Sequence, residues 1–135
     1  MNSLFAHSDA SFKNGISTHS YILRTYSGRK IKETSYVGYE SDSMKAEIDS
    51  LVKLLNYCAA KDYRGLKIYS DCKHVVDACY DRCDLKLDIT YLKHMLKKTK
   101  SKLKWKPREF NSEADRCAKK LMRSVENKMK MEVEE

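Results

Sequence analysis

The stretch that decides the fold lies in the middle of the chain: Leu66-Lys67-Ile68-Tyr69-Ser70-Asp71-Cys72-Lys73-His74-Val75-Val76. Its first five residues form a compact run after the break at Arg64-Gly65, and such a run predicts a buried strand. From Lys73 to Arg82 the small apolar residues recur at helical spacing, which predicts a helix. A strand that leads directly into a helix is the crossover unit of α/β proteins.

Three strands are predicted ahead of this unit. They are short segments of apolar, aromatic and β-branched side chains, at Leu4–Asp9, Ser20–Tyr26 and Lys30–Tyr39. The turn signal Ser27-Gly28 separates the last two. We interpret the three strands as an antiparallel meander.

The period of the apolar residues then changes to that of a helix. From Met44 to Ala59 they fall on one side, and we expect this helix to end near Lys61 with Ser43 or Ser41 as its N-cap.

The carboxyl-terminal part continues the alternation of helices and strands. We predict a helix from Asp88 to about Thr99, a half-buried strand at Lys102–Lys106 that Pro107 stops, and a final helix from Asn111. This helix is expected to give way to a charged tail from about residue 126.

This order of elements predicts an α/β fold. The sheet would be mixed and five-stranded, with three antiparallel strands followed by two parallel ones, and helices on both faces. A length of 135 residues suits one domain, spanning residues 1–135. No apolar run approaches the roughly 18 residues of a membrane span, and the N-terminus lacks the order of a secretory signal. We therefore expect a cytoplasmic protein without a membrane partner, and a monomer.

The positive charge is concentrated in one window. The formal net charge is +8, yet the segment from Ile89 to Arg108 has eight basic residues and no acidic one, so the rest of the chain is neutral. A field of one sign on one part of the surface indicates a polyanionic partner such as nucleic acid. A solubilising lysine surface is the simpler alternative.

Four carboxylates stand in unusual places. Asp9 and Asp71 each follow a predicted strand, and two parallel neighbouring strands would bring them to the same edge of the sheet. Glu47 and Asp115 fall on the apolar sides of their predicted helices. For any one of them a cap, an ion pair or a solvated strand end is a sufficient explanation. Four together indicate a site if the fold gathers them into one cluster.

Buried carboxylates need hydrogen bonds or a cation to remain charged. The five cysteines have no C-x-x-C spacing and the four histidines are scattered, so oxygen ligands would dominate such a site. Hard oxygen ligands favour Mg²⁺ or Mn²⁺ over zinc.

Four segments resemble the signature blocks of the type 1 ribonuclease H family, in the order of that family. They are Ser8-Asp9-Ala10-Ser11, Ala46-Glu47, Ile68-Tyr69-Ser70-Asp71 and Pro107-Arg108-Glu109-Phe110-Asn111-Ser112-Glu113-Ala114-Asp115-Arg116-Cys117-Ala118. The last block, with the pattern P-R-E-x-N-x-x-A-D-x-x-A, is the most specific. The segment after Asp9 resembles a divergent, reverse-transcriptase-like branch, and the resemblance runs from Leu4 to about Val125.

The resemblance implies a ribonuclease H-like fold and a metal-dependent endoribonuclease that hydrolyses the RNA strand of RNA/DNA hybrids. Asp9, Glu47, Asp71 and Asp115 would be its catalytic residues and would hold two Mg²⁺ ions, or Mn²⁺ in their place. Asp9 would bridge the ions, Glu47 and Asp71 would complete one side, and Asp115 would hold the other ion. One ion would activate the attacking water and the other would stabilise the leaving 3′ oxygen.

Seven residues are candidates for contacts with the substrate: Ser11, Asn14, Lys73, Lys102, Lys104, Lys106 and Arg108. The three lysines at 102–106 share one face of their predicted strand, where the phosphates of a double-stranded substrate are the natural target. Lysines on an edge strand also protect a sheet against aggregation. We interpret Tyr69, Trp105 and Phe110 as core side chains rather than surfaces for stacked bases.

Two alternative functions stay open. One is a nuclease of the same fold with another nucleic-acid substrate, because Ser43-Met44-Lys45 stands where many family members have an Asn that recognises the hybrid. The other is a non-catalytic nucleic-acid-binding module that keeps the scaffold and the basic face.

Overall fold

A computed structural model of the chain describes residues 4–39, 42–85 and 87–134, with the backbone alone at 111, 112 and 130–134. Its strands are β1 (Leu4–Lys13), β2 (Ile16–Thr25), β3 (Lys30–Gly38), β4 (Lys67–Ser70) and β5 (Lys102–Trp105). Its helices are α1 (Ser43–Ala60), α2 (Lys73–Cys79), α3 (Thr90–Lys98), the 3₁₀ helix η1 (Arg108–Asn111) and α4 (Ser112–Glu134).

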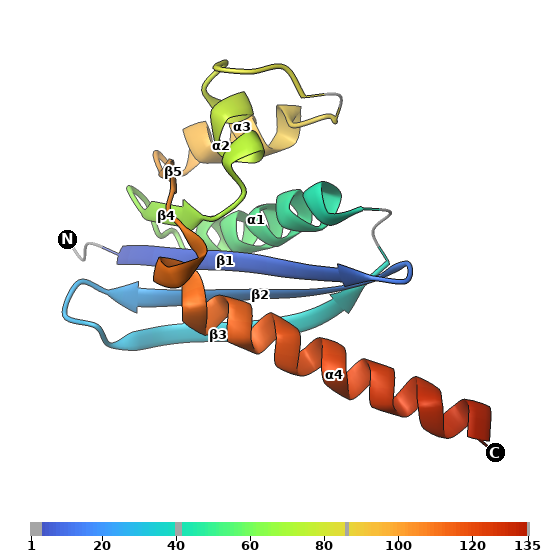
Figure 1. Cartoon of the computed structure of the whole chain (residues 1–135). Helices are drawn as coiled ribbons and strands as arrows, with labels where there is room; N and C mark the ends of the chain where they lie inside the picture. The colour runs from blue at the N-terminus through green and yellow to red at the C-terminus, as the bar shows by residue number, and fades with distance from the viewer. Residues whose placement is uncertain (1–3, 40–41, 86, 135) are drawn as a thin grey trace.

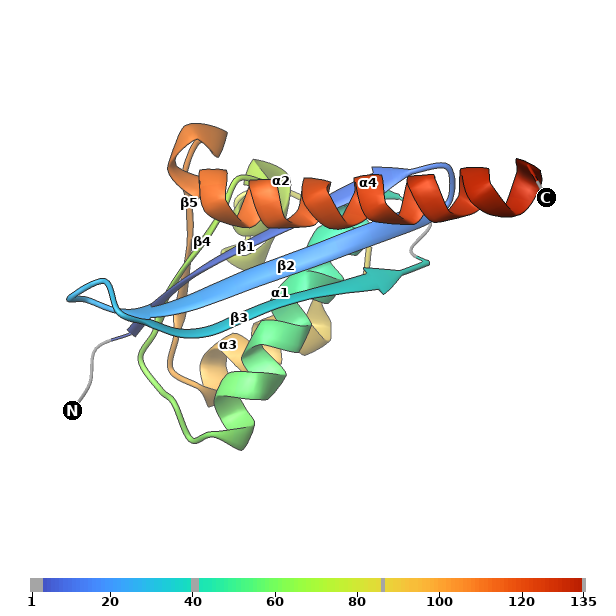
Figure 2. The same cartoon turned by 90° about the horizontal axis from the view of Figure 1, so that it is seen from below.

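The strands form one mixed sheet in the order β3-β2-β1-β4-β5 (Figure 1). The first three strands pair antiparallel, while β4 pairs parallel with both β1 and β5. The predicted α/β fold is confirmed. Helices cover both faces of the sheet, with α1 and α3 on one side and α4 on the other (Figure 2).

The main core lies between the sheet and α1. Leu51, Leu54 and Leu55 of α1 are fully buried there, together with side chains from every strand except β3, and Leu92 and Leu96 of α3 extend the same cluster. Burial of one such side chain stabilises the fold by about 1.5–3 kcal/mol. None of the described helices is both long and apolar enough to cross a membrane.

The first hairpin differs from the prediction. β1 does not end at Asp9 but continues to Lys13, and β2 begins at Ile16 rather than Ser20. The chain reverses at Asn14-Gly15, whose φ angles of 54° and 76° are both positive. This is the geometry of a two-residue type I′ turn, which Asn-Gly favours.

The longer β1 changes where Asp9 lies. His7 pairs with Tyr69 of β4, so Asp9, two residues further, is level with Asp71, just beyond the carboxyl end of β4. The expected meeting of the two acids therefore occurs, but within β1 rather than at its end.

Several helix boundaries also differ. The N-cap of α1 is Asp42, whose carboxylate accepts from the N–H of Lys45 at 2.8 Å. Ser43 is instead the first helical residue, and Ser41 lies outside the described residues. An anionic cap suits the positive end of the helix dipole.

The other boundaries concern α2, α3 and α4, of which α3 begins at Thr90 rather than Asp88. α2 ends at Cys79 instead of Arg82, shortly before Asp81 turns to a positive φ of 59°. α4 follows η1 and continues to Glu134, so the stretch expected as a charged tail is helical. Its Glu, Lys and Met residues are good helix formers.

Candidate active site

Asp9 is the most buried acid of the described residues, with 1% of its surface exposed. It lies on the same side of β1 as Phe5 and His7, which is the side that faces α4. The Ser50 hydroxyl of α1 donates to the Asp9 carbonyl at 3.3 Å, which ties the backbone of β1 to that helix.

Glu47 comes from the second turn of α1 and is 6% exposed. The backbone N–H of Ala10 donates to its Oε1 at 2.9 Å. Because Ala10 is the neighbour of Asp9 in β1, this hydrogen bond orients the Glu47 carboxylate toward Asp9. The prediction that an acid on the apolar stripe of this helix points inward is confirmed.

Asp9, Glu47 and Asp71 form one cluster. Each offers a carboxylate oxygen, and among the described residues these three oxygens lie within 4.8 Å of one another. Asp9 Oδ2 and Glu47 Oε2 are buried without a hydrogen-bond partner. A buried acceptor oxygen without a hydrogen-bond donor destabilises the folded protein. Carboxylate oxygens are the ligands that a hard divalent cation prefers, so the cluster fits such a cation.

The electrostatics of the cluster agree with this fit. Burial raises the pKa of the Asp9 carboxyl far above its ordinary value of 3.8, and the adjacent Glu47, Asp115 and Asp71 raise it further. Burial likewise raises the pKa of Glu47, and the charge of Asp71 adds to the effect. The acids repel one another without a cation, so the cluster favours protons or metal ions.

Asp115 lies in the first turn of α4 and is half-buried. Burial raises its pKa, but a hydrogen bond with Asp9 and the Lys119 ammonium, 3.1 Å away, hold the pKa below its ordinary value. Asp115 therefore borders the cluster through Asp9.

Arg108 also borders the cluster. Its Nε donates to Asp71 Oδ2 at 3.3 Å, and 68% of its side chain is exposed. A guanidinium there offsets part of the negative charge and presents its remaining donors to solvent.

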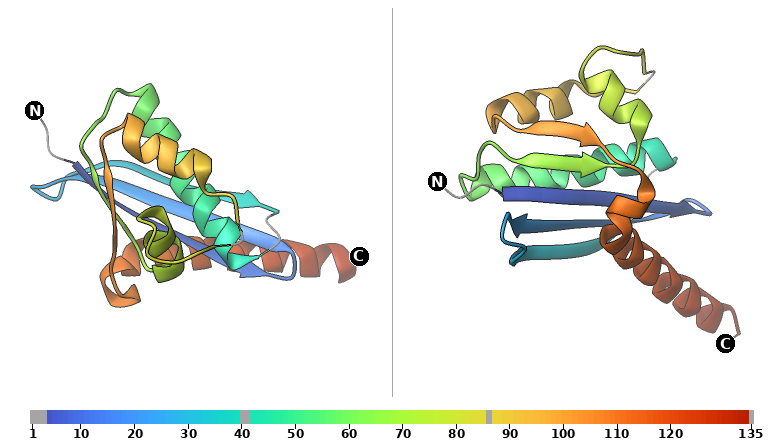
Figure 3. Two further views of the ribbon diagram at one scale, coloured as in Figure 1. Left: turned by 90° about the horizontal axis from the view of Figure 1, so that it is seen from above. Right: turned by 60° about the vertical axis from the view of Figure 1, so that its left-hand side comes forward.

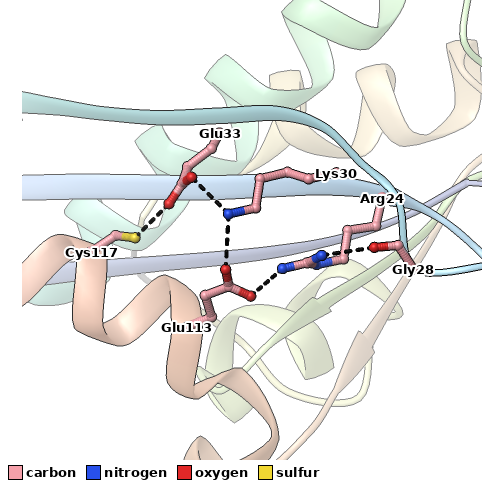
Figure 4. A network of polar contacts seen from close by, with 6 residues as sticks. All are labelled: Arg24, Gly28, Lys30, Glu33, Glu113 and Cys117. Carbon is pink, nitrogen blue, oxygen red and sulfur yellow. Dashed lines mark hydrogen bonds and ion pairs between the residues drawn. The ribbon is translucent and has the colours of Figure 1, made fainter.

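A polar network fixes the start of α4 on the sheet (Figure 4). Glu113 bonds to Arg24 of β2, and its other oxygen lies 3.0 Å from Lys30 Nζ of β3. Lys30 also donates to Glu33, which accepts from the Cys117 thiol at 3.0 Å. Because Asp115 lies between Glu113 and Cys117, these contacts set its position.

A second network lies behind the site, and the sequence analysis does not predict it. His19 is fully buried, with Nδ1 at 2.9 Å from Ser50 Oγ and Nε2 at 2.6 Å from Ser17 Oγ. Since the Ser50 hydroxyl donates to the Asp9 carbonyl, it accepts from Nδ1–H of His19. Histidine and serine residues at the spacings of Ser17, His19 and Ser50 are common in sequences. The sequence therefore does not reveal that the two serines bond to the two ring nitrogens.

The structure separates the predicted substrate contacts. Ser11 is two residues beyond Asp9 on the same side of β1 and is half-buried. Asn14 is at the hairpin tip, five residues from Asp9 and thus roughly 16 Å along the strand. It is not close to the carboxylates, and its sequence signal was that of a turn.

Lys73 is the first residue of α2, two residues after Asp71, and its Nζ lies over the Trp105 ring at 5.8 Å from the centroid. Lys102 and Lys104 project from the exposed edge strand β5. Lys106 follows that strand, and its Nζ lies 4.6 Å from the centroid of Tyr69 and 5.5 Å from that of Phe110. Beside β5, a cavity of about 540 Å³ is lined by Lys93, Lys97, Lys100 and Lys102.

The interpretation of Trp105 and Phe110 as core residues is wrong, since they are 44% and 64% exposed. Trp105 is on an edge strand, where its indole N–H donates to the Asp71 carbonyl at 3.2 Å. Phe110 belongs to η1, which interrupts the path into α4 and turns the ring toward solvent. Tyr69 is half-buried.

Comparisons with known proteins agree with this geometry. A family described as reverse transcriptase-like matches residues 7–121 of the chain. No curated protein matches it significantly.

Solved structures with a similar fold include ribonucleases H. RNase H1 from the halophilic archaeon Halobacterium salinarum superposes with a TM-score of 0.81 at 17% identity, over 90% of this chain and 98% of that one. The N-terminal RNase H domain of a Mycobacterium tuberculosis protein gives 0.76 at 17% identity, over 96% and 99%. LC11-RNase H1, in complex with an RNA/DNA hybrid, gives 0.75 at 15%, over 87% and 95%. At these identities the likeness shows the fold.

Proposed function

This chain belongs to the reverse transcriptase-like family and has a ribonuclease H-like fold, and we propose that it hydrolyses the RNA strand of RNA/DNA hybrids as a metal-dependent endoribonuclease. The observation that carries the proposal is the cluster of Asp9, Glu47 and Asp71, with its two buried oxygens that have no donor. Such a cluster destabilises the folded protein unless it binds a cation. A catalytic role for that cation would explain why the protein contains the cluster.

The chain's own acids would hold Mg²⁺ or Mn²⁺. Asp9, Glu47 and Asp71 would supply the nearest oxygens, and Asp115, which borders Asp9, would supply the fourth carboxylate for a second ion. Bound metal would lower the pKa of an attacking water and stabilise the charge on the leaving 3′ oxygen. The Ala10 N–H and the Ser50 hydroxyl fix Glu47 and β1, which positions two of these ligands through the chain's own hydrogen bonds.

Basic side chains would bind the phosphates around the cluster. Arg108 is the nearest, and Lys73 lies at the start of α2 close to Asp71. Lys102, Lys104 and Lys106 extend the positive surface along β5. The complex of LC11-RNase H1 with a hybrid supports a nucleic-acid partner of this class for the fold.

A substrate panel tests the proposal. The chain would be incubated in Mg²⁺, in Mn²⁺ and in EDTA with labelled RNA/DNA hybrid, duplex RNA, duplex DNA and single strands. We expect cleavage of the hybrid alone, in the RNA strand, and none in EDTA. Cleavage of another substrate instead would replace the hybrid by that substrate, and cleavage of none by the folded protein would favour a binding module.

A further inference from the structure

One face of the sheet has a continuous row of aromatic rings that the proposed chemistry does not use. Tyr26 lies 5.7 Å from Phe5, Phe5 lies 5.7 Å from His7, and His7 lies 5.2 Å from Tyr69, measured between ring centroids. Lys106 then joins Tyr69 to Phe110 by resting against both rings. The two ends of the row, Tyr26 and Phe110, are 53% and 64% exposed.

No described α-helix covers this part of the sheet, and the short helix η1 borders it with Phe110. α4 packs on β1, β2 and β3, and it lies toward the carboxyl ends of β1, β4 and β5, leaving the opposite ends of these strands open in front (Figure 3, right). The strand register places Phe5 beside Lys67, and His7 beside Tyr69, on the open side. Lys102 and Lys104 continue the same face onto β5. We refer to this surface, Phe5, His7, Tyr26, Tyr69 and Phe110 with the lysines at 67, 102, 104 and 106, as the aromatic-lysine face.

The charge of the aromatic-lysine face is of one sign. β4 contains one lysine and β5 contains two, and neither strand has an acidic residue. Lys67 rests over the Tyr26 ring at 5.8 Å, so cations alternate with rings across the strands. Lysines are depleted in protein–protein interfaces, so a face with lysines between its rings suits a polyanion better than a protein partner.

We propose that the aromatic-lysine face binds an unpaired, single-stranded polynucleotide, with bases stacked on the exposed rings and phosphates on the lysines. Aromatic side chains on neighbouring strands with surrounding cations are the arrangement by which sheets bind single strands, and any base can stack. Phe5, His7 and Asp9 follow one another on one side of β1, so the face leads directly to the carboxylate cluster. If the proposed function holds, the bound strand is a tail of the cleaved duplex.

Binding of labelled 12-mers of dT and of U, measured by fluorescence anisotropy in Ca²⁺ at moderate salt, tests the proposal without depending on cleavage. The wild type should bind at least one of them, and the two arms distinguish DNA from RNA. The variant Tyr26→Ala/Phe110→Ala removes the two most exposed rings and should lose affinity about tenfold or more. Tyr91→Ala, which removes a 52% exposed ring from α3 on the other side of the sheet, should bind as the wild type does.

Two results would overturn the proposal. Absence of binding by the wild type would leave the face to a protein partner. Equal binding by the wild type and Tyr26→Ala/Phe110→Ala, with loss in Lys67→Gln/Lys104→Gln, would mean that charge alone attracts the strand. Both ring positions are exposed, so thermal unfolding of the double variant close to that of the wild type verifies its fold. Failure of the chain to cleave blunt hybrid would count against the nuclease and leave this test unaffected.

Discussion

At the scale of single residues, the burial of Asp9 and Glu47 has a measurable consequence for stability. We predict that Asp9→Asn raises the unfolding temperature in EDTA and abolishes the stabilisation by Mg²⁺. Removing one charge relieves the repulsion in the cluster and also removes a metal ligand. In a chain of this size, each kcal/mol corresponds to about 3–5 °C. Thermal unfolding of both proteins in EDTA and in Mg²⁺ is the measurement.

The same prediction has a defined pH dependence. The folded state raises the pKa of Asp9 and Glu47 above their ordinary values of 3.8 and 4.5, so it binds protons more tightly than the unfolded chain. These groups therefore make the metal-free protein less stable as pH rises above that range. The gain from Asp9→Asn in EDTA should be larger at pH 8 than at pH 5. Asp62→Asn, at an exposed position, is the control. An Asp9→Asn variant that is less stable than the wild type in EDTA at pH 8 would contradict the prediction.

A second residue-scale prediction concerns Gly38. A Cβ at this position would lie 2.7 Å from His19 Nε2 and 2.9 Å from Ser17 Oγ, both in the buried network behind Asp9. Gly→Ala in a strand ordinarily stabilises a protein, but here we expect Gly38→Ala to lower the free energy of unfolding by about 1–3 kcal/mol through overpacking. Urea unfolding measures it, with Ser35→Ala on the same strand as control. A neutral or stabilising effect of Gly38→Ala would show that the network yields easily.

At the scale of elements, the sequence predicted the order of strands and helices because each has its own period of apolar residues. It missed the second half of β1 because the residues from Ala10 to Lys13 are small, polar or exposed, and their partners in β2 are mainly polar. Pairing with β2, not apolar patterning, holds this segment. The turn residues Asn14-Gly15 are the available signal for this longer hairpin, whereas the sequence analysis assigns Asn14 to a substrate contact.

Part of the site could also be predicted from the local period of apolar residues. An acid on an apolar stripe is a local anomaly, and Glu47 shows it without a structure. The exposure of Trp105 depends on β5 being the edge strand, and the partners of Asp115 depend on β2 and β3. Such long-range relations have no local signature.

The junction of η1 and α4 gives an element-scale prediction. We expect Glu113→Gln to lower the free energy of unfolding by up to about 1 kcal/mol at pH 7, because the variant loses charge pairing with Arg24. Lys30 and Arg24 hold the pKa of Glu113 below its ordinary value of 4.5. The carboxylate's contribution is therefore present above that value and lost as pH falls through the lowered pKa.

Urea unfolding of the wild type and Glu113→Gln at pH 7 and at pH 3 measures this difference. The difference in the free energy of unfolding should be present at pH 7 and diminish at pH 3. The control variant Glu109→Gln, at an exposed position in η1, should leave stability unchanged at both pH values. A difference of the same size at both pH values would show that shape, not charge, anchors α4.

At the scale of the whole molecule, the asymmetric charge should govern binding to nucleic acid. We predict that neutralising Lys102, Lys104 and Lys106 to Gln weakens binding of a non-cleavable hybrid and flattens its dependence on salt. Three phosphate contacts would account for a change of up to about 2.7 in the slope of log K against log salt. Affinity measured from low to moderate salt gives that slope.

The control for this prediction changes the same net charge elsewhere, with Lys53, Lys61 and Lys128 replaced by Gln. These lysines are exposed and belong to α1, its C-cap and α4. We expect a smaller change in the slope for the control. Unchanged affinity and slope in the Lys102, Lys104 and Lys106 variant would leave those lysines with protection of the β5 edge as their role.

The most direct test of the account is the rate at which the wild type, Asp71→Asn and Asp77→Asn cleave an RNA/DNA hybrid in Mg²⁺. Asp71 belongs to the carboxylate cluster, whereas Asp77 is an acid of α2 that pairs with Arg82. The account predicts cleavage of the RNA strand by the wild type and Asp77→Asn, and its loss in Asp71→Asn. The account would be contradicted if folded Asp71→Asn cleaved the hybrid at the rate of the wild type. It would also be contradicted if the folded wild type cleaved nothing in Mg²⁺ or Mn²⁺.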